Sequence, residues 1–372
     1  MRVSRLNLSG IRNYSEASLN PDIRLNILIG KNAQGKTTLL EALYMLATSR
    51  SWRAGKDMEL IKWGCDTARV TADVERDQQN NVEIEIGLHR EEKKQVKVNT
   101  IRQSRLGDLM GQVNIVLIEP HDVEIVRTDP SRRRKFMDIE ISQIQPQYCH
   151  LIARYRKILD QRNRLLKDIH CGRMSRSMLD VWTEQLVSYG ANIIERRLHF
   201  ISNLKKIAAV IHQEITEDNE HLDIAYVSNM ELRGDESSDE ISARMQEFLI
   251  DKREEELGRG MTLAGPQRDD LLFTLNDVDA RIYGSQGQQR TIALSLRMAE
   301  IDIMEESAGE PPVVLLDDVM TDLDESRRGH VFEMTGGRCQ TFITTASSKL
   351  FEAEFMSHGS VFHIEDGRIS PR

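Results

Sequence analysis

The sequence predicts an α/β nucleotide-binding domain that is interrupted by a mostly helical insertion. Residues 30–37 (GKNAQGKT) fit the G-x-x-x-x-G-K-[ST] pattern of a phosphate-binding loop at every fixed position. Residues 313–318 (VVLLDD) form an apolar run that ends in two carboxylates, where such domains place a magnesium ligand. Between these segments, residues 147–215 carry apolar side chains at helical spacing. The three observations together indicate this fold class.

The bulk composition is that of a soluble globular protein. The chain has 372 residues, and because a domain usually has about 150 residues, we expect about two domains. No apolar run reaches the ~18 residues of a membrane-spanning helix, and the N-terminus (MRVSRL) lacks the apolar core of a secretory signal. The cysteines show no metal-binding or redox spacing; they are Cys65, Cys149, Cys171 and Cys339. We therefore expect a cytoplasmic protein with no membrane partner.

The first 120 residues predict strands around one helix. Short apolar or alternating runs bounded by turn residues predict strands at 3–8, 25–29, 70–74, 82–88 and 112–118. Strand 25–29 runs directly into the phosphate-binding loop, which opens a predicted helix over 37–46. The alternation at 70–74 and 82–88 is typical of antiparallel strands. A strand, a glycine-rich loop and a helix in this order are the context that such a loop requires.

The central part of the chain has a different periodicity. Helical spacing predicts helices at 147–170, 178–200, 201–215 and 241–257. Gly265 and Pro266 mark the return to the first domain, and residues 271–275 predict a strand. The expected organisation is an N-terminal ATPase part at 1–123, a helical arm at 124–261 and a C-terminal ATPase part at 262–372. The arm is too short and irregular for a heptad coiled coil.

The phosphate-binding loop supplies the first set of candidate site residues. Its backbone N–H groups and the following helix N-terminus would hold the β- and γ-phosphates of ATP. Lys36 would neutralise phosphate charge, and the Thr37 hydroxyl would hold Mg²⁺. A chance match in a strand–helix turn is the alternative. The candidate nucleotide-binding residues here are Gly30, Lys31, Asn32, Ala33, Gln34, Gly35, Lys36, Thr37 and Thr38.

The acidic strand end supplies the metal and water-activating candidates. Asp317 is the expected second Mg²⁺ ligand. Asp318 occupies the position where ATPases of the ABC type usually carry a glutamate that orients the attacking water. A pair of capping carboxylates is the alternative. Residues 321–324 (TDLD) resemble the loop that crosses the dimer interface in these ATPases, and residues 345–347 (TAS) lack the histidine of transporter ATPases. Together these departures predict slow hydrolysis.

Residues 285–289 (SQGQQ) resemble the signature loop with which an ABC-type ATPase contacts nucleotide on a second copy of itself. Such a string also occurs by chance in linkers, so its position matters: it precedes a predicted helix over 291–304 and then the 313–317 strand. Ser285, Gly287 and Gln288 would then contact the γ-phosphate of the nucleotide bound to the other subunit. The candidate catalytic residues are Lys36, Asp318 and Ser285. ATP binding and homodimerisation would be one linked equilibrium.

The sequence resembles the RecF family of recombination mediators, which are related to the heads of SMC proteins. The resembling segments span nearly the whole chain: GIRNY at 10–14, GKNAQGKTTLLEA at 30–42, SRSWR at 49–53, DPSRRRKFMD at 129–138, GPQRDD at 265–270, SQGQQR at 285–290 and LLDDV at 315–319. The resemblance implies an ABC/SMC-head-type fold, ATP and Mg²⁺ as cofactors, and a weak, DNA-stimulated ATPase. It also implies binding to double-stranded or gapped DNA, and cooperation with RecR and RecO in loading RecA at damaged forks. These are roles in DNA repair, replication, recombination and the SOS response. Gln267 departs from the family's usual histidine.

Charge is distributed unevenly along the chain. The net charge of −9 alone argues against a nucleic-acid binder. Residues 127–173, however, contain twelve Lys/Arg and five Asp/Glu, which gives a local net charge of +7. Residues 214–256 contain four Lys/Arg and fifteen Asp/Glu, which gives a local net charge of −11. Arg154, Lys157 and Arg164 fall near one helix face and are the candidate DNA contacts. A solvated helix face is the alternative, and Arg12 and Arg53 could each touch nucleotide or DNA.

Two rival functions remain open from the sequence. A transporter-type ABC ATPase subunit is disfavoured by the missing histidine, Asp318 and the basic segment, and co-purification with membranes would favour it. A binding module that needs ATP only as a structural ligand would show no DNA-dependent turnover.

Overall fold

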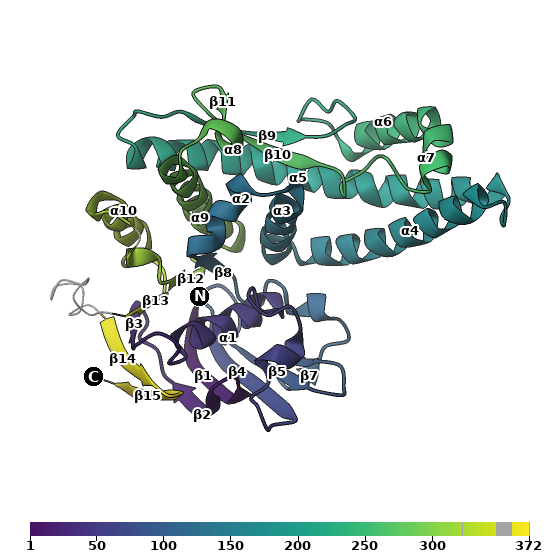
Figure 1. Cartoon of the computed structure of the whole chain (residues 1–372). Coiled ribbons are helices and arrows are strands. Elements are labelled where there is room, and N and C mark those ends of the chain that lie inside the picture. Colours follow the sequence, from purple (N-terminus) through teal and green to yellow (C-terminus); the bar gives the residue numbers. More distant parts are fainter. Residues whose placement is uncertain (322, 347–358, 372) are drawn as a thin grey trace. The chain divides into compact units, whose positions relative to one another are not determined.

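The chain folds into two compact units, one of which is assembled from both ends of the sequence. The computed structural model describes residues 1–321, 323–346 and 359–371. The first unit comprises residues 1–123 and 293–372, and the second comprises residues 124–292. Figure 1 shows the chain coloured along the sequence, with the second unit running from blue (α2 and α3) through teal to green. Among the helices described, none combines the length and apolar character needed to cross a membrane.

A sheet with a parallel centre organises the first unit. Its strands lie in the order β15 (Arg368–Pro371), β14 (Gly359–Glu365), β3 (Leu25–Ile29), β13 (Thr341–Thr345), β12 (Val313–Asp317) and β8 (Ile115–Ile118). All neighbours are parallel except β14 and β15. The central strands are buried on both faces, which explains their continuous apolar sequences. In such a sheet, ligands bind beyond the carboxyl ends of the strands.

A second, antiparallel sheet in the same unit confirms the strands expected from alternation. Its order is β2 (Tyr14–Leu19), β1 (Arg2–Ile11), β4 (Thr67–Glu75), β5 (Val82–His89), β6 (Gln95–Val98) and β7 (Ile101–Arg102). Buried and exposed residues alternate along β4 and β5. Helix α1 (Lys36–Thr48) is buried almost throughout, and its leucines belong to one core with side chains of both sheets. The α1 helix is therefore fixed in place on both sides.

The second unit is mostly helical but also contains a small sheet. Its helices are α2 (Val123–Arg127, whose first residue lies at the unit boundary), α3 (Pro130–Ile144), α4 (Pro146–His170), α5 (Leu179–Ile215), α6 (Ser238–Asp251), α7 (Arg253–Arg259) and α8 (Ala280–Tyr283). The sheet has the order β11 (Val278–Asp279), β10 (Asp270–Leu275), β9 (Leu222–Val227). The sequence did not predict β9, because its run is short and follows directly on a long helix.

The second boundary of the insertion differs from the expected one. The sequence placed the return to the first unit at residue 262, whereas residues 262–292 belong to the second unit. The reason is that β10 pairs along its whole length with β9, a partner within the insertion. Helix α9 (Gln286–Ala308) starts in the second unit and continues into the first. The last helix of the chain is α10 (Glu325–Thr335), and short 3-10 turns lie at Asp57–Leu60, Leu106–Leu109, Pro120–Asp122, Arg176–Met178 and Val319–Thr321.

Candidate functional site

The phosphate-binding loop connects β3 to α1 at the carboxyl edge of the parallel sheet. Two of its positions admit only glycine. A Cβ at Gly30 would lie 2.3 Å from the carbonyl oxygen of Ile364, and Gly35 has φ 114° with Asn13 and Tyr14 packed against it. Asn13 Nδ2 donates to the Gln34 carbonyl at 2.8 Å and the Tyr14 hydroxyl to the Gly35 carbonyl at 3.1 Å. The loop is thus held from outside by the first hairpin.

Lys36 lies at the start of α1 and turns back over the loop. Its Nζ donates to the carbonyl oxygens of Gly30 at 2.7 Å and Lys31 at 2.9 Å. Burial lowers the pKa of Lys36, and the carboxylates of Asp318 and Asp317 oppose that shift. An ammonium group beside a helix N-terminus is suited to bind a phosphate.

Thr37 and Asp317 meet at the same edge of the sheet. The Thr37 hydroxyl donates to Oδ1 of Asp317 at 2.9 Å, and the Thr344 hydroxyl at the end of β13 donates to the same oxygen at 2.8 Å. Thr344 in turn accepts the backbone N–H of Asp318 at 2.9 Å. The sequence missed Thr344, because only the β12–β13 pairing brings it beside Asp317.

These oxygens fit a Mg²⁺ ion that is shared with a nucleotide. Within the described part of the chain, no group of three or more His, Cys, Asp or Glu side chains could hold a metal by itself. Mg²⁺ bound with ATP needs only one or two protein oxygens, because phosphates and waters complete its octahedron. The Thr37 hydroxyl and the Asp317 carboxylate are two hard oxygen donors next to the phosphate-binding loop.

Asp318 has an unusual backbone. It adopts φ 53°, in the left-handed region that few residues other than Gly, Asn and Asp visit. Two residues of the segments discussed from the sequence, Asp322 of 321–324 and Ser347 of 345–347, lie outside the described residues.

Arg12 pairs with a carboxylate on the loop's helix. Arg12 Nε lies 2.8 Å from Oε2 of Glu41, a side chain of α1 that is 1% exposed, and the Ser51 hydroxyl also donates to Glu41. Arg12 therefore ties the first hairpin to α1. The Arg53 side chain is exposed.

A second carboxylate stands one strand away from Asp317. Leu316 of β12 is paired with Ile118 of β8, so the next residues, Asp317 and Glu119, leave neighbouring strands on the same face. Trp52 Nε1 donates to Oε2 of Glu119 at 2.9 Å. Burial, followed by the Asp122 carboxylate, raises the pKa of Glu119 to about 7. The sequence did not predict the contact between Trp52 and Glu119, because no local spacing links the two positions.

The candidate signature residues form the exposed N-terminus of α9. Ser285 and Gln288 cap the helix reciprocally: the Gln288 N–H donates to Ser285 Oγ at 3.2 Å, and the Ser285 N–H donates to Gln288 Oε1 at 2.8 Å. Gly287 is exposed. The first turn, QGQQ, carries no charged side chain, and Gln286 and Gly287 at the start of this 23-residue helix are exposed.

The three candidate DNA contacts are exposed on α4. Arg154, Lys157 and Arg164 all point away from the buried side of the helix, which carries Tyr155 and Ile158. None of the three forms an ion pair with another described residue, in contrast to Arg156 and Arg162 on the same helix. Their charges are therefore available to a partner.

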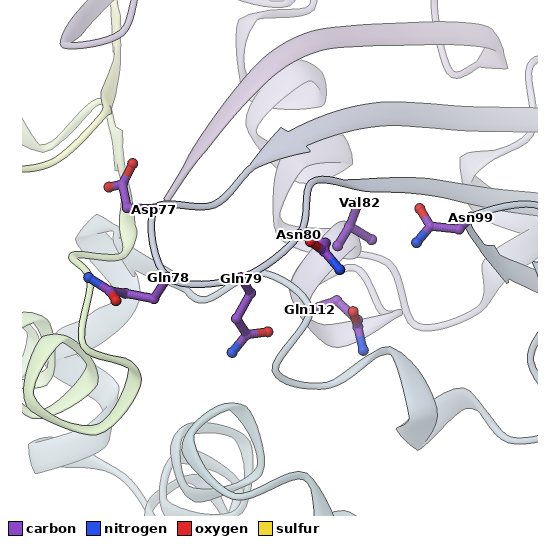
Figure 2. Close-up of a pocket in the computed structure, with 7 residues that line it drawn as sticks. All are labelled: Asp77, Gln78, Gln79, Asn80, Val82, Asn99 and Gln112. Atoms are coloured by element: carbon purple, nitrogen blue, oxygen red, sulfur yellow. The ribbon is translucent and has the colours of Figure 1, made fainter.

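A polar pocket of the first unit lies elsewhere. It has a volume of about 740 Å³ and is lined mainly by amide side chains, with Asp77 and Val82 (Figure 2). Its residue Gln112 precedes β8, which places the pocket toward the end of the parallel sheet opposite to Gly30 and Asp317. It is thus separate from the candidate nucleotide site.

Known proteins resemble this chain over nearly its whole length. The family model described as "RecF/RecN/SMC N terminal domain" matches residues 2–370. A protein of Halothermothrix orenii described as DNA replication and repair protein RecF is 42% identical, with 100% of this chain and 99% of the relative covered. A protein of Bacillus subtilis with the same description is 40% identical over 99% and 100% of the two chains.

Solved structures resemble this chain in fold. A structure of the recombination mediator protein RecF-ATP in the RecFOR pathway has a TM-score of 0.92 at 34% identity, covering 100% of this chain and 97% of that one. An SMC head bound to the C-winged helix domain of ScpA has a TM-score of 0.58 at 13% identity, covering 100% and 97% of the two chains, and is similar in fold alone.

Proposed function

Because this chain belongs to the RecF family within the RecF/RecN/SMC N-terminal domain group, we propose that it is an ATP-dependent DNA-binding protein of replication and repair. The observation that carries the proposal is the meeting of Lys36, Thr37 and Asp317 at one sheet edge. Related structures described as RecF-ATP support ATP as the nucleotide. Membership of this family favours the proposal over a subunit of a membrane transporter.

The proposed nucleotide site uses residues of the first unit. The loop amides of residues 30–38 and the Lys36 ammonium bind the β- and γ-phosphates. Bound Mg²⁺, held by Thr37 and Asp317, supplies charge neutralisation for these phosphates. Asp318 accepts a hydrogen bond from the attacking water and orients it. The carboxylate of Asp318 is one methylene shorter than glutamate, which supports slow hydrolysis.

The proposed dimer is completed by a second copy. The α9 N-terminus, with Ser285, Gly287 and Gln288, binds the γ-phosphate held by the other subunit. Its exposure and the uncharged side chains of its first turn support that role. ATP binding thereby favours the homodimer, and hydrolysis releases it.

Double-stranded or gapped DNA is the proposed partner of the dimer. Arg154, Lys157 and Arg164 on the arm bind its phosphates, and bound DNA stimulates the weak ATPase. In this role the protein cooperates with RecR and RecO and helps to load RecA. Structures described as belonging to the RecFOR pathway support the cooperation with RecR and RecO.

Fluorescence anisotropy with a labelled duplex tests this function. We expect tight binding with Mg²⁺ and ATP, and weak binding with ADP or without nucleotide. Changing Arg154, Lys157 and Arg164 together to glutamine should weaken binding, and each lost phosphate contact should lower the slope of log K against log salt by about 0.9. Equal binding under all nucleotide conditions would contradict the proposal. A turnover assay with and without DNA separates an ATPase from a module that uses ATP only as a structural ligand.

A further inference from the structure

The second unit contains a small basic pocket that the proposed function does not use. The pocket has a volume of about 240 Å³ and lies among α3, α4, α5 and the turn at 265–267. The charged and amide side chains that line it are Arg134, Lys135, Arg156, Arg197, Asp138 and Gln267. Four cations thus share the pocket with one lining carboxylate.

That carboxylate is already occupied by partners inside the protein. Asp138 Oδ1 accepts from Arg197 at 2.8 Å and from the Tyr148 hydroxyl at 3.0 Å, and Oδ2 accepts from Arg156 at 3.2 Å. Arg197 is 2% exposed and also donates to the Pro266 carbonyl at 2.7 Å. One lining carboxylate therefore contacts two guanidinium groups. The carboxylates of Asp270 and Asp269, which do not line the pocket, also act on Arg134.

The local sequence places these cations against the helix dipole. The α3 helix starts with Pro130, Ser131 and then four consecutive cations, at the end where a helix dipole favours anions. Arg132 pairs with Glu124, and Arg133 forms a two-bond contact with Asp270, at 2.5 and 2.9 Å. Arg134 instead donates to a neutral acceptor, the Asp269 carbonyl, at 2.9 Å. Burial and then the neighbouring Arg197 lower the pKa of Arg134.

Gln267 forms part of the floor of this pocket. The Tyr155 hydroxyl donates to its Oε1, and its Nε2 donates to the Ala264 carbonyl at 2.8 Å. The amide therefore fixes the 265–267 turn beside Arg197 through neutral hydrogen bonds. A neutral side chain here adds no further positive charge to the pocket.

We propose that this pocket binds a phosphate group. Guanidinium forks match phosphate oxygens in pairs, and a phosphate anion would complement the four cations that line the pocket beside the α3 N-terminus. The exposed side chains of Lys135 and Arg156 form the rim, and Arg134 and Arg197 form the deeper wall. The phosphate comes either from a DNA backbone or from a free phosphate; only the first source rests on the proposed function.

Thermal unfolding with inorganic phosphate tests the pocket itself. The background is the full-length Lys36→Ala variant, which removes the phosphate-binding loop as a competing site. We expect the unfolding midpoint to rise with phosphate, relative to chloride at equal ionic strength. The rise should be lost on adding Lys135→Gln and Arg156→Gln, and kept on adding Arg173→Gln, an exposed arginine outside the pocket. No rise in Lys36→Ala, or a rise that survives the double change, overturns the proposal.

Duplex binding then identifies the source of the phosphate. If the source is DNA, Lys135→Gln with Arg156→Gln lowers the salt slope of duplex binding by about 0.9 per phosphate lost, and Arg173→Gln does not. If the phosphate-induced rise is lost but the slope is unchanged, the pocket binds free phosphate. The duplex measurement keeps Lys36 and uses Mg²⁺ and ATP. Both results support the phosphate pocket, and the thermal-unfolding test does not depend on ATP binding by Lys36.

Discussion

The hydroxyl of Thr37 donates a hydrogen bond to Oδ1 of Asp317 at 2.9 Å, although the two residues are 280 positions apart. The parallel arrangement of β3, β13 and β12 makes this contact, because all three strands end at the same edge. Thr344 donates to the same oxygen from the strand between them. Thr37 and Asp317 are the proposed ligands of Mg²⁺, whereas Thr344 has a structural role, because it holds the Asp317 carboxylate in place.

Asp317→Asn should remove the contribution of Mg²⁺ to ATP affinity. The amide keeps the shape of the side chain but loses the charge that a hard cation requires. Titrations of a fluorescent ATP analogue with Mg²⁺ and with EDTA should give equal affinities in this variant. Thr344→Val is the matched control: it should lower the free energy of unfolding by about 1–3 kcal/mol, since it leaves buried polar groups without partners. It should nevertheless retain Mg²⁺-dependent binding; a Mg²⁺ effect that persists in Asp317→Asn would argue against the metal role.

Lys36→Ala should abolish ATP binding, and Lys36→Arg should restore it only in part. Alanine removes a charged contact to the phosphates, and arginine returns the charge with a different shape. Isothermal titration calorimetry with Mg²⁺ and ATP measures the ATP affinity of both variants. Wild-type affinity in the alanine variant would show that the loop does not bind the phosphates.

Asp318→Asn should bind ATP and dimerise but turn over more slowly. Asparagine tolerates the left-handed backbone of this position, φ 53°, so the local fold is preserved. The amide cannot accept a proton from water as a carboxylate does. Phosphate release under saturating ATP measures the change, and an unchanged rate would assign water activation to another group.

Ser285→Arg should leave ATP binding to the monomer intact and block dimerisation. A long cation at the exposed α9 N-terminus would occupy the docking position of the second copy. Mixing this variant with Lys36→Ala provides a sharper experiment, since one composite site then combines an intact loop with an intact signature. We expect mixed dimers in ATP where each variant alone stays monomeric. Dimerisation of Ser285→Arg alone would reject the trans contact.

Glu119 should make folding stability depend on pH. Its pKa is raised to about 7 in the folded protein from 4.5, so the folded state binds more protons between these values. The stabilisation is fully present below pH ~4.5 and is lost as pH rises through ~7; it is at most about 3 kcal/mol, and less because the side chain is partly exposed.

Glu119→Gln should flatten this dependence while keeping an acceptor for Trp52. Urea unfolding between pH 5 and 8.5 should show the variant gaining stability relative to wild type as pH rises. A parallel pH dependence in both proteins would show that Glu119 is ionised throughout.

The sequence predicted what depends on local pattern. The β3 strand, α1 and β12 follow from apolar runs and the glycine pattern, and the phosphate-binding loop follows from them. The contacts of Thr344, Glu119 and Trp52 depend on strand pairing, which no spacing in the chain encodes. The same is true of β9, whose pairing with β10 moves the boundary of the insertion. The support of the loop by Asn13 and Tyr14 lies in a segment that the family resemblance marked without giving its role.

The most direct test of the account is the mass of the wild-type protein by sedimentation velocity with Mg²⁺ and ATP, with ADP and without nucleotide. If two copies share each ATP through Lys36 of one and Ser285 of the other, the species in ATP has twice the monomer mass, and the other two samples are monomeric. The same mass under all three conditions would contradict an ATP-linked dimer.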